Sequence, residues 1–433
     1  MSNSASAGSI GLALALLSAC GKPAPQQPTP EPATADTTRP IKPIIDSGAH
    51  PPPRVIIPAD STPPPPPPLI RAALPVRLAM TGDINLGTST QPGGVPADSG
   101  RSTFAKVDSL LVGDLVVGNF EGMFADSGVS KKCGVPDTAG VAFRETGTGD
   151  QGPGTGKAKA APDTAKKQKP KRICYAFATP SYLAPRLKEA GFTHLNLANN
   201  HANDFGHEAR VQSDSILHAL PIATYGPLGQ IVIDTLRQGD RGTIVGLLGF
   251  ATYPWAYDLT DTAGSRAAVD SVRKLVDVLI VTFHGGKEGK DASHVAPGEE
   301  NMVGEPRGDL RAWARVVIDA GADAVVGHGP HVLRGIEFYQ GKPIFYSLGN
   351  FATYKGFSLE GPMALSTVLQ LELTGNGAFV TARLASLQQR WRQGPSPDPK
   401  GRAIKQVQLL TRQDFGPTGA RIGSDGTVFP PVD

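Results

Sequence analysis

The strongest constraint on the fold is a series of short apolar runs that each end in small polar residues. They occur at VRLAMTGDINLG (76–87), DLVVGNFEG (114–122), THLNLANNHANDFG (193–206), GTIVGLLGF (242–250), KLVDVLIVTFHGGKEG (274–289) and ADAVVGHGPHVL (322–333). Helical patterns at 181–191 and 309–321 alternate with these runs, and KPIFYSLGNF (342–351) resembles a hairpin. Short runs that are apolar throughout are typical of strands buried on both faces. The pattern therefore predicts an α/β protein with a buried sheet.

The distribution of proline separates this folded part from what precedes it. Of the 40 prolines, 18 lie between Pro23 and Pro75, and such a segment cannot build a hydrophobic core. Residues 20–75 are expected to be a tether, either an extended polyproline II stalk or a disordered chain. The folded domain is expected at 76–393, with a Gly- and Lys-rich basic insertion at about 126–172. Residues 394–433 are expected to be a loosely structured tail.

The N-terminus resembles a bacterial lipoprotein signal. The apolar stretch from residue 10 to 17 has about the length of a signal-peptide core and is too short to span a bilayer. The following LSAC (17–20) resembles a lipobox, which predicts a signal peptide at 1–19 and lipidation of Cys20. The alternative is an ordinary secretory signal with an unmodified cysteine. Residues 2–19 contain no Lys or Arg, so either the charged region is reduced to the amino terminus or the true start lies upstream of Met1.

These features predict an extracytoplasmic protein that acyl chains on Cys20 hold to a membrane of the bacterial cell envelope. Cys133 and Cys174 flank the basic insertion, and export favours a disulfide between them. The net charge of +3 is small for 433 residues and gives no case for a nucleic-acid partner.

Side chains able to bind a metal or transfer a proton follow the ends of the predicted strands. They are Asp83, Glu121, Asn200, His201, His284, Glu288, His328 and His331. In open α/β sheets, ligands bind beyond the carboxyl ends of the strands, so these side chains are expected to meet. Carboxylates, an amide oxygen and neutral imidazoles suit Zn, Mn or Fe. Any one of these histidines is compatible with a structural role, but the whole set favours a metal site.

The motifs GDINLG, GNFEG, LANNHANDFG, FHGGKEG and GHGPHVLRGIEFYQGKPIFYSLGNF resemble those of the CapA family. These are poly-γ-glutamate capsule proteins related to calcineurin-like metallophosphoesterases, and the resemblance covers roughly residues 76–375. It implies a four-layer α/β/β/α sandwich and a site for one or two divalent ions. It also implies a link to anionic polymer assembly or export, with envelope synthase or export proteins as partners.

The resemblance further implies roles for single residues. His201 would serve as an acid or orient the substrate, and metal ligands would be Asp83, Glu121, Asn200, His284, His328 and His331. Asn85 stands where most of the superfamily has a ligand histidine, which leaves the number of ions open.

The residues themselves suggest roles for two carboxylates to which the resemblance assigns none. Asp204 is expected to cap or orient its loop, for example by holding His201. Glu288 either positions a ligand, acts on substrate, or pairs with Lys287 or Lys290.

Two functions remain open from the sequence, and a third, a degenerate fold used only for protein contacts, is disfavoured because the polar set is present together. The first is an envelope-anchored assembly factor that binds metal and anionic polymer without turnover. The second is a metal-dependent hydrolase, either a phosphoesterase or an amide-cleaving enzyme, in which a cation lowers the pKa of a bound water. The sequence contains no Gly-x-Ser-x-Gly elbow, and its cysteines lie outside the polar set, so serine or thiol catalysis is disfavoured.

Overall fold

The computed structural model describes residues 69–130, 132–133 and 175–432, all within one compact unit. Within these residues the chain forms a ten-stranded sheet, here sheet I, and a seven-stranded sheet, here sheet II. Sheet I contains β1 (Val76–Asn85), β2 (Leu115–Phe120), β5 (His194–Asn196), β6 (Ala223–Tyr225), β16 (Asn350–Thr353), β17 (Leu365–Leu373), β18 (Phe379–Gln388), β19 (Ser396–Pro397), β20 (Arg421–Ile422) and β21 (Thr427–Phe429). Sheet II contains β7 (Val232–Gln238), β8 (Arg241–Ala251), β9 (Tyr257–Asp258), β10 (Val278–His284), β13 (Ala324–His328), β14 (Ile336–Tyr339) and β15 (Lys342–Phe345).

Helices and short elements complete the described chain. The helices are α1 (Pro185–Glu189), α2 (His207–Ala219), α3 (Thr262–Arg273), α4 (Leu310–Asp319) and α5 (Arg402–Phe415). Single 3₁₀ turns are η1 (Asp108–Leu110), η2 (Ser181–Leu183), η3 (Gly361–Ala364) and η4 (Gly416–Thr418). Two small two-stranded pairs are β3 (Met123–Phe124) with β4 (Ala178–Thr179), and β11 (Glu300–Met302) with β12 (Glu305–Gly308).

The two sheets pack face to face, as the alternation along β10 shows. Val278 and Ile280 point into a core shared with sheet I, whereas Leu279 and Val281 point into a second core formed with α3 and α4. All four side chains are fully buried, because this strand is covered on both faces. This explains why its sequence is continuously apolar rather than alternating.

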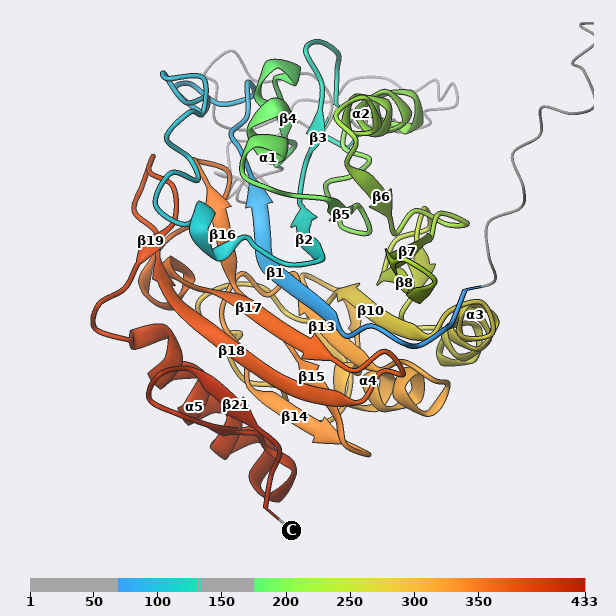
Figure 1. Cartoon of the computed structure of the whole chain (residues 1–433). Coiled ribbons are helices and arrows are strands. Elements are labelled where there is room, and N and C mark those ends of the chain that lie inside the picture. The colour runs from blue at the N-terminus through green and yellow to red at the C-terminus, as the bar shows by residue number, and fades with distance from the viewer. Residues whose placement is uncertain (1–68, 131, 134–174, 433) are drawn as a thin grey trace, which may run out of the picture. The chain divides into compact units, whose positions relative to one another are not determined.

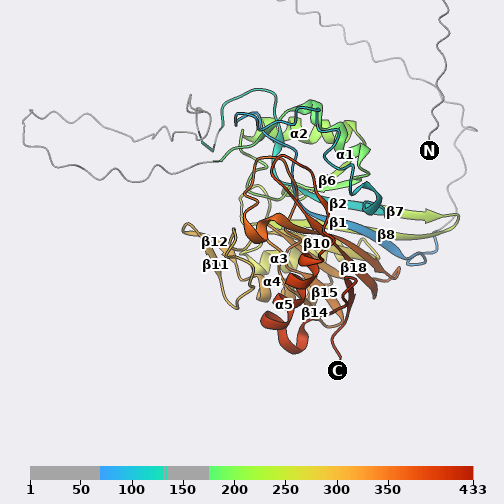
Figure 2. The same cartoon turned by 90° about the vertical axis from the view of Figure 1, so that its left-hand side faces the viewer.

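Sheet I is built in the same way around β1. Leu78 and Met80 face the core between the sheets, while Ala79 faces a third core that receives Leu187 of α1 and Leu217 of α2. Figures 1 and 2 show α1 and α2 together on the β1–β2 side, with α3 and α4 beside sheet II. The described unit is thus a four-layer α/β/β/α sandwich, which confirms the expected fold class.

Parallel pairing places the polar ends of neighbouring strands side by side. In sheet I, Asp83 of β1 is in register with Asn119 of β2, and Asn119 with Asn196 of β5. In sheet II, His284 of β10 is in register with His328 of β13. The carboxyl ends of both sheets therefore present polar rows at one end of the sandwich.

The C-terminal segment differs from its prediction. Residues 394–433 were expected to be loose, but α5 buries Ile404 and Val407 in the core between the sheets, and Phe415 stacks on Tyr346. Figure 1 shows α5 beside β18 and β21. The helix was missed because its short apolar stripe packs against β14 and β18, which belong to different sheets and meet only in the folded chain.

Two other expectations need correction. Residues 342–351 do not form a hairpin, since β15 pairs with β14 in sheet II whereas β16 crosses to pair with β1 in sheet I. The folded part also begins before residue 76, because Ile70 already bridges to Arg241 at the start of β8.

Several predictions concern parts of the chain outside the described residues. These are the signal peptide at 1–19, Cys20, the tether up to residue 68, the insertion from residue 134 to 172, and Cys174. Cys133 is buried and disulfide-bonded. In the described part of the chain, no helix combines the length and apolar character needed to cross a membrane.

Candidate metal centre

The close approach of β1 and β16 fixes the first carboxylate of the site. The backbone N–H of Asp83 donates to the carbonyl of Gly349 at 3.0 Å, and a Cβ on Gly82 would overlap that same oxygen. Gly349 adopts a φ of 71°, which glycine tolerates without strain. The GD and SLGN motifs therefore contact each other through their backbones.

Asp83 lies fully buried at the centre of the cluster. Asn119 Nδ2 donates to Oδ1 at 2.8 Å, His331 Nδ1 lies 3.0 Å from Oδ2, and His328 Nδ1 lies 3.6 Å from Oδ1. Burial by itself would raise the pKa of Asp83, but the hydrogen bond and charge of His331 outweigh it and lower the pKa. Asp83 is thus an ionised carboxylate that joins residues from both sheets.

Glu121 is the least satisfied group of the site. Both carboxylate oxygens are buried without a hydrogen-bond partner, while His331 Nε2 and His284 Nε2 approach Oε1 to 3.5 and 3.7 Å. Burial raises the pKa of Glu121 well above its usual value, and the negative charges of Asp83 and Glu288 add to this effect. A buried carboxylate without donors is costly unless something else satisfies it.

Three of the buried histidines, those around Asp83 and Glu121, differ in their affinity for a proton. Burial lowers the pKa of His328 to about 4, and burial together with nearby positive charge lowers that of His284 well below its usual value. For His331 burial acts in the same direction, but Glu121 and Asp83 outweigh it and raise the pKa to about 10. In the metal-free protein His331 is therefore an imidazolium between two carboxylates.

Asp83, Glu121 and His331 could together hold one cation. Each offers a ligand atom, and these atoms all lie within 4.8 Å of one another. The orphaned oxygens of Glu121 and the unpartnered Nδ1 of His328 fit a centre that receives a cation. The donor set of oxygen and imidazole nitrogen suits Zn, Mn or Fe.

His201 forms a separate pair with Asp204. Its Nδ1 lies 2.7 Å from Asp204 Oδ2, which also accepts the backbone N–H of Phe177 at 2.8 Å. Burial lowers the pKa of His201 although Asp204 opposes this. The Phe357 ring contacts both His201, at a centroid distance of 6.2 Å, and His331, at 4.3 Å. The pair is therefore one aromatic ring away from the carboxylate cluster.

Asn200 and Glu288 make few contacts with the other predicted site residues. The side-chain oxygen of Asn200 is buried and has no hydrogen-bond partner, as an amide ligand would need. Glu288 Oε2 lies 4.0 Å from His331 Nε2, and its Oε1 accepts from Arg307 at 2.6 Å. The expected alternative, an ion pair of Glu288 with Lys287 or Lys290, is wrong. Glu288 pairs with Arg307, and Lys290 pairs with Glu360.

Asn85, which stands in place of a ligand histidine, points elsewhere. Its Nδ2 donates to the carbonyl of Glu121 at 3.2 Å and its Oδ1 accepts the N–H of Gly87 at 3.2 Å. Both ends of the amide are thus used by the backbone. Asn85 supports the position of Glu121 and has no free oxygen for a metal.

Sequence reasoning missed two contributors. Arg307 is almost fully buried behind Glu288, and nothing in its EPRG context indicates a partner 19 residues away. Asn119 lies in the quoted GNFEG motif, and its place at the end of an apolar run was the available signal; the structure puts it in register between Asp83 and Asn196. Both act on the orientation of the predicted residues.

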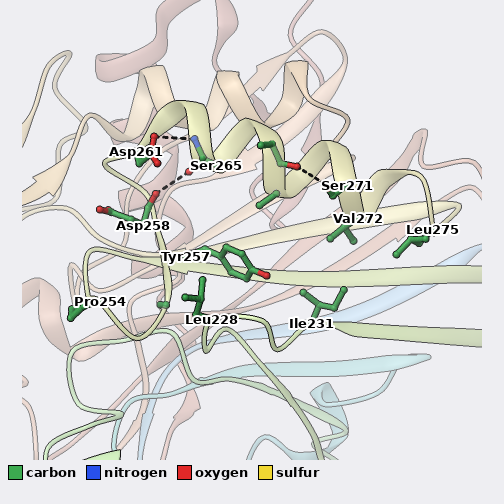
Figure 3. Close-up of a pocket in the computed structure, with 14 residues that line it drawn as sticks. Leu228, Ile231, Pro254, Tyr257, Asp258, Asp261, Ser265, Ser271, Val272 and Leu275 are labelled. Atoms are coloured by element: carbon green, nitrogen blue, oxygen red, sulfur yellow. Dashed lines mark hydrogen bonds between the residues drawn. The ribbon is translucent and has the colours of Figure 1, made fainter.

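A separate hollow of about 680 Å³ lies on the α3 side of sheet II. Figure 3 shows Leu228, Ile231, Tyr257, Val272 and Leu275 around it, with Asp258 and Asp261 at one end. Its lining contains none of the predicted site residues. The hollow is mostly apolar and is distinct from the metal centre.

Comparison with known families matches the part of the chain that follows the first two carboxylates of the site. Residues 159–355 match the family described as bacterial capsule synthesis protein PGA_cap. This range contains the site residues from Asn200 to His331, whereas Asp83 and Glu121 precede it.

Two curated relatives bear similar names. The capsule biosynthesis protein CapA of Bacillus anthracis is 33% identical over 213 residues, covering 45% of this chain and 47% of that protein. The PGA biosynthesis protein CapA of Bacillus subtilis (strain 168) is 31% identical over 216 residues, covering 45% and 50%. The chain therefore spans about half the length of these relatives.

Solved structures are only remotely similar. A 5'-nucleotidase precursor from Thermus thermophilus has a TM-score of 0.36 at 13% identity, over 78% of this chain and 59% of that one. A hypothetical protein from the same organism has a TM-score of 0.38 at 14% identity, over 72% and 100%.

Proposed function

Because the chain belongs to the CapA family, matched through its PGA_cap region at 159–355, we propose that it acts in capsule polymer production. The polymer is poly-γ-glutamate or a similar anionic chain, and the role lies in its synthesis, assembly or export. The names of the two Bacillus relatives support this polymer class.

The proposed function includes a divalent cation, either Mn, Zn or Fe, held by Asp83, Glu121 and His331. The observation that carries this is Glu121, whose two buried oxygens have no hydrogen-bond donor. Asn200 and His328 remain predicted ligands around this core, and His284 lies beside it, with its Nε2 3.7 Å from Glu121 Oε1. When bound, the cation supplies Lewis acidity and offsets negative charge on an anionic substrate.

The chain's own residues then orient the substrate and transfer protons to or from it. His331 must release its proton to the surroundings before its Nε2 lone pair can bind a cation. His201 is neutral, and Asp204 holds it through Nδ1. Its Nε2 can therefore exchange a proton with the substrate. Phe177 and Phe357 pack against His201 and limit the access of water to it.

Anchoring at the envelope completes the proposal. A lipidated Cys20 followed by the tether at 20–75 would hold the folded unit near the membrane, where synthase or export proteins work. The LSAC sequence and the proline-rich segment behind it support this.

A genuine metal-dependent hydrolase is the second candidate. The His201–Asp204 pair favours it, because a buried imidazole held by a carboxylate is the arrangement expected of an acid–base group. Its substrate would be a phosphoester, or an amide such as the γ-glutamyl bond, outside the cytoplasm.

One experiment separates the two candidates. The purified full chain is incubated with γ-linked polyglutamate, with Mn²⁺ or with EDTA, and binding and polymer length are measured by calorimetry and gel filtration. The polymer-handling role predicts Mn²⁺-dependent binding that Glu121→Gln abolishes, with polymer length unchanged. Metal-dependent shortening would favour the hydrolase, and wild-type protein that neither binds nor cuts the polymer would refute the polymer assignment.

A further inference from the structure

Two asparagines behind the cluster have amide orientations fixed by the backbone. The Oδ1 of Asn196 accepts the N–H of Ala198 at 3.1 Å, and the Oδ1 of Asn199 accepts the N–H of His201 at 3.1 Å. A backbone N–H can only donate, so the other end of each side chain must be its NH₂ group. Consistent with this, Asn199 Nδ2 also donates to the carbonyl of Phe120 at 2.9 Å.

These two NH₂ groups determine the orientation of Asn119. Asn196 Nδ2 and Asn199 Nδ2 both donate to Asn119 Oδ1, at 3.1 and 3.4 Å. The opposite end of Asn119 faces Asp83 Oδ1 at 2.8 Å, and an ionised carboxylate only accepts. Both neighbours therefore require that the NH₂ group of Asn119 points towards Asp83.

The second hydrogen of that NH₂ group faces His284. Asn119 Nδ2 lies 3.3 Å from His284 Nδ1, which must then accept. A neutral imidazole that accepts at Nδ1 carries its proton at Nε2. A doubly protonated ring is disfavoured by the same contact, because its Nδ1–H would face the NH₂ group.

We propose that Asn119 is a positioning residue that fixes the Nε2–H form of His284, so that this histidine presents a donor and not a lone pair to the site. His284 then donates to an anionic oxygen of the bound substrate, while the cation rests on Asp83, Glu121 and His331. This inference rests on the proposed metal and anionic-polymer function and assigns His284 a different task from the one its position in the motif suggests.

The surroundings of His284 Nε2 agree with a donor. It is buried, has no hydrogen-bond partner, and lies 3.7 Å from Glu121 Oε1, which leaves it unpaired at the edge of the cluster. His331 shows the contrasting arrangement. Its Nδ1 faces the carboxylate of Asp83, so in the neutral ring the proton lies on Nδ1 and the Nε2 lone pair is available to a cation.

The tautomer can be read directly from nitrogen chemical shifts of the metal-free full chain labelled with ¹⁵N-histidine. The His284 signals are identified by their loss in His284→Gln. We expect the proton on Nε2 in the wild type. We expect it to move to Nδ1 in Asn119→Asp, because the new carboxylate can accept from that nitrogen. A wild-type proton on Nδ1 overturns the inference, and this result decides the matter even where Asn119→Asp fails to fold.

Metal titration gives an independent readout. His284→Gln should weaken Mn²⁺ binding by less than about threefold, whereas Glu121→Gln should weaken it by well over about 100-fold, above the range seen for residues behind ligands. Equal losses in the two variants would overturn the inference. Wild-type protein that binds no metal would instead refute the proposed function, and the tautomer measurement would still stand on its own.

Discussion

The buried His328 makes the metal-free protein sensitive to acid, and its contribution can be calculated. Burial lowers the pKa of its ring from 6.5 to about 4. Each unit corresponds to about 1.4 kcal/mol, so full protonation of this one residue costs about 3 kcal/mol of folding free energy. That cost is a large part of the stability of a typical domain.

The sign follows from which state binds the proton first. The unfolded chain takes it up near pH 6.5 and the folded chain only near pH 4, so acid favours unfolding. The stability associated with neutral His328 is complete above pH 6.5 and is lost as the pH falls towards 4. Replacing the ring with an amide in His328→Gln removes this dependence.

The assay is urea unfolding in EDTA at about pH 7 and about pH 4, followed by tryptophan fluorescence. Between the two conditions, the wild type should lose about 3 kcal/mol more than His328→Gln. The exposed His207, changed to Gln, controls for loss of a histidine elsewhere and should follow the wild type. If His328→Gln and the wild type lose the same stability within about 0.5 kcal/mol, the reasoning about this site is wrong.

Three further predictions concern neighbouring residues. Glu121→Gln should stabilise the metal-free protein at alkaline pH. Burial raises the pKa of Glu121, so the folded wild type resists the ionisation that the unfolded chain undergoes above pH 4.5. Urea unfolding at about pH 8 in EDTA measures this effect, and an unchanged midpoint would contradict it. Asp204→Asn should lower any metal-dependent turnover by about 10- to 100-fold while metal content stays unchanged, because it frees His201 without touching the cluster; full activity in this variant would exclude a catalytic pair. Gly82→Ala should yield insoluble protein in an expression and solubility assay, because its Cβ would overlap the carbonyl of Gly349; a soluble variant with a wild-type melting temperature would argue against that contact.

The strands that carry the site could be predicted, because their apolar runs and polar ends are local features of the sequence. Parallel pairing then brings Asp83 beside Asn119, and His284 beside His328, without further information. The resemblance to the CapA family added the sandwich arrangement, which the alternating cores of the two sheets confirm.

What the sequence did not indicate depends on contacts between the sheets. Asp83 meets His331 across 248 positions of the chain, and no periodicity encodes that distance. The orientation of Asn119 and the pairing of Arg307 with Glu288 are likewise decided by packing that only the folded chain provides. The same holds for α5, whose apolar face packs against strands from both sheets.

Metal content decides whether the buried carboxylates and imidazoles form a metal centre. Elemental analysis of the purified full chain should find stoichiometric Mn, Zn or Fe in the wild type. The metal should be retained in His201→Ala, whose ring belongs to a separate pair, and lost in Asp83→Ala, whose carboxylate lies at the centre of the cluster. A wild type without metal, or an Asp83→Ala variant that keeps all of its bound metal, would show that these residues do not form the metal centre.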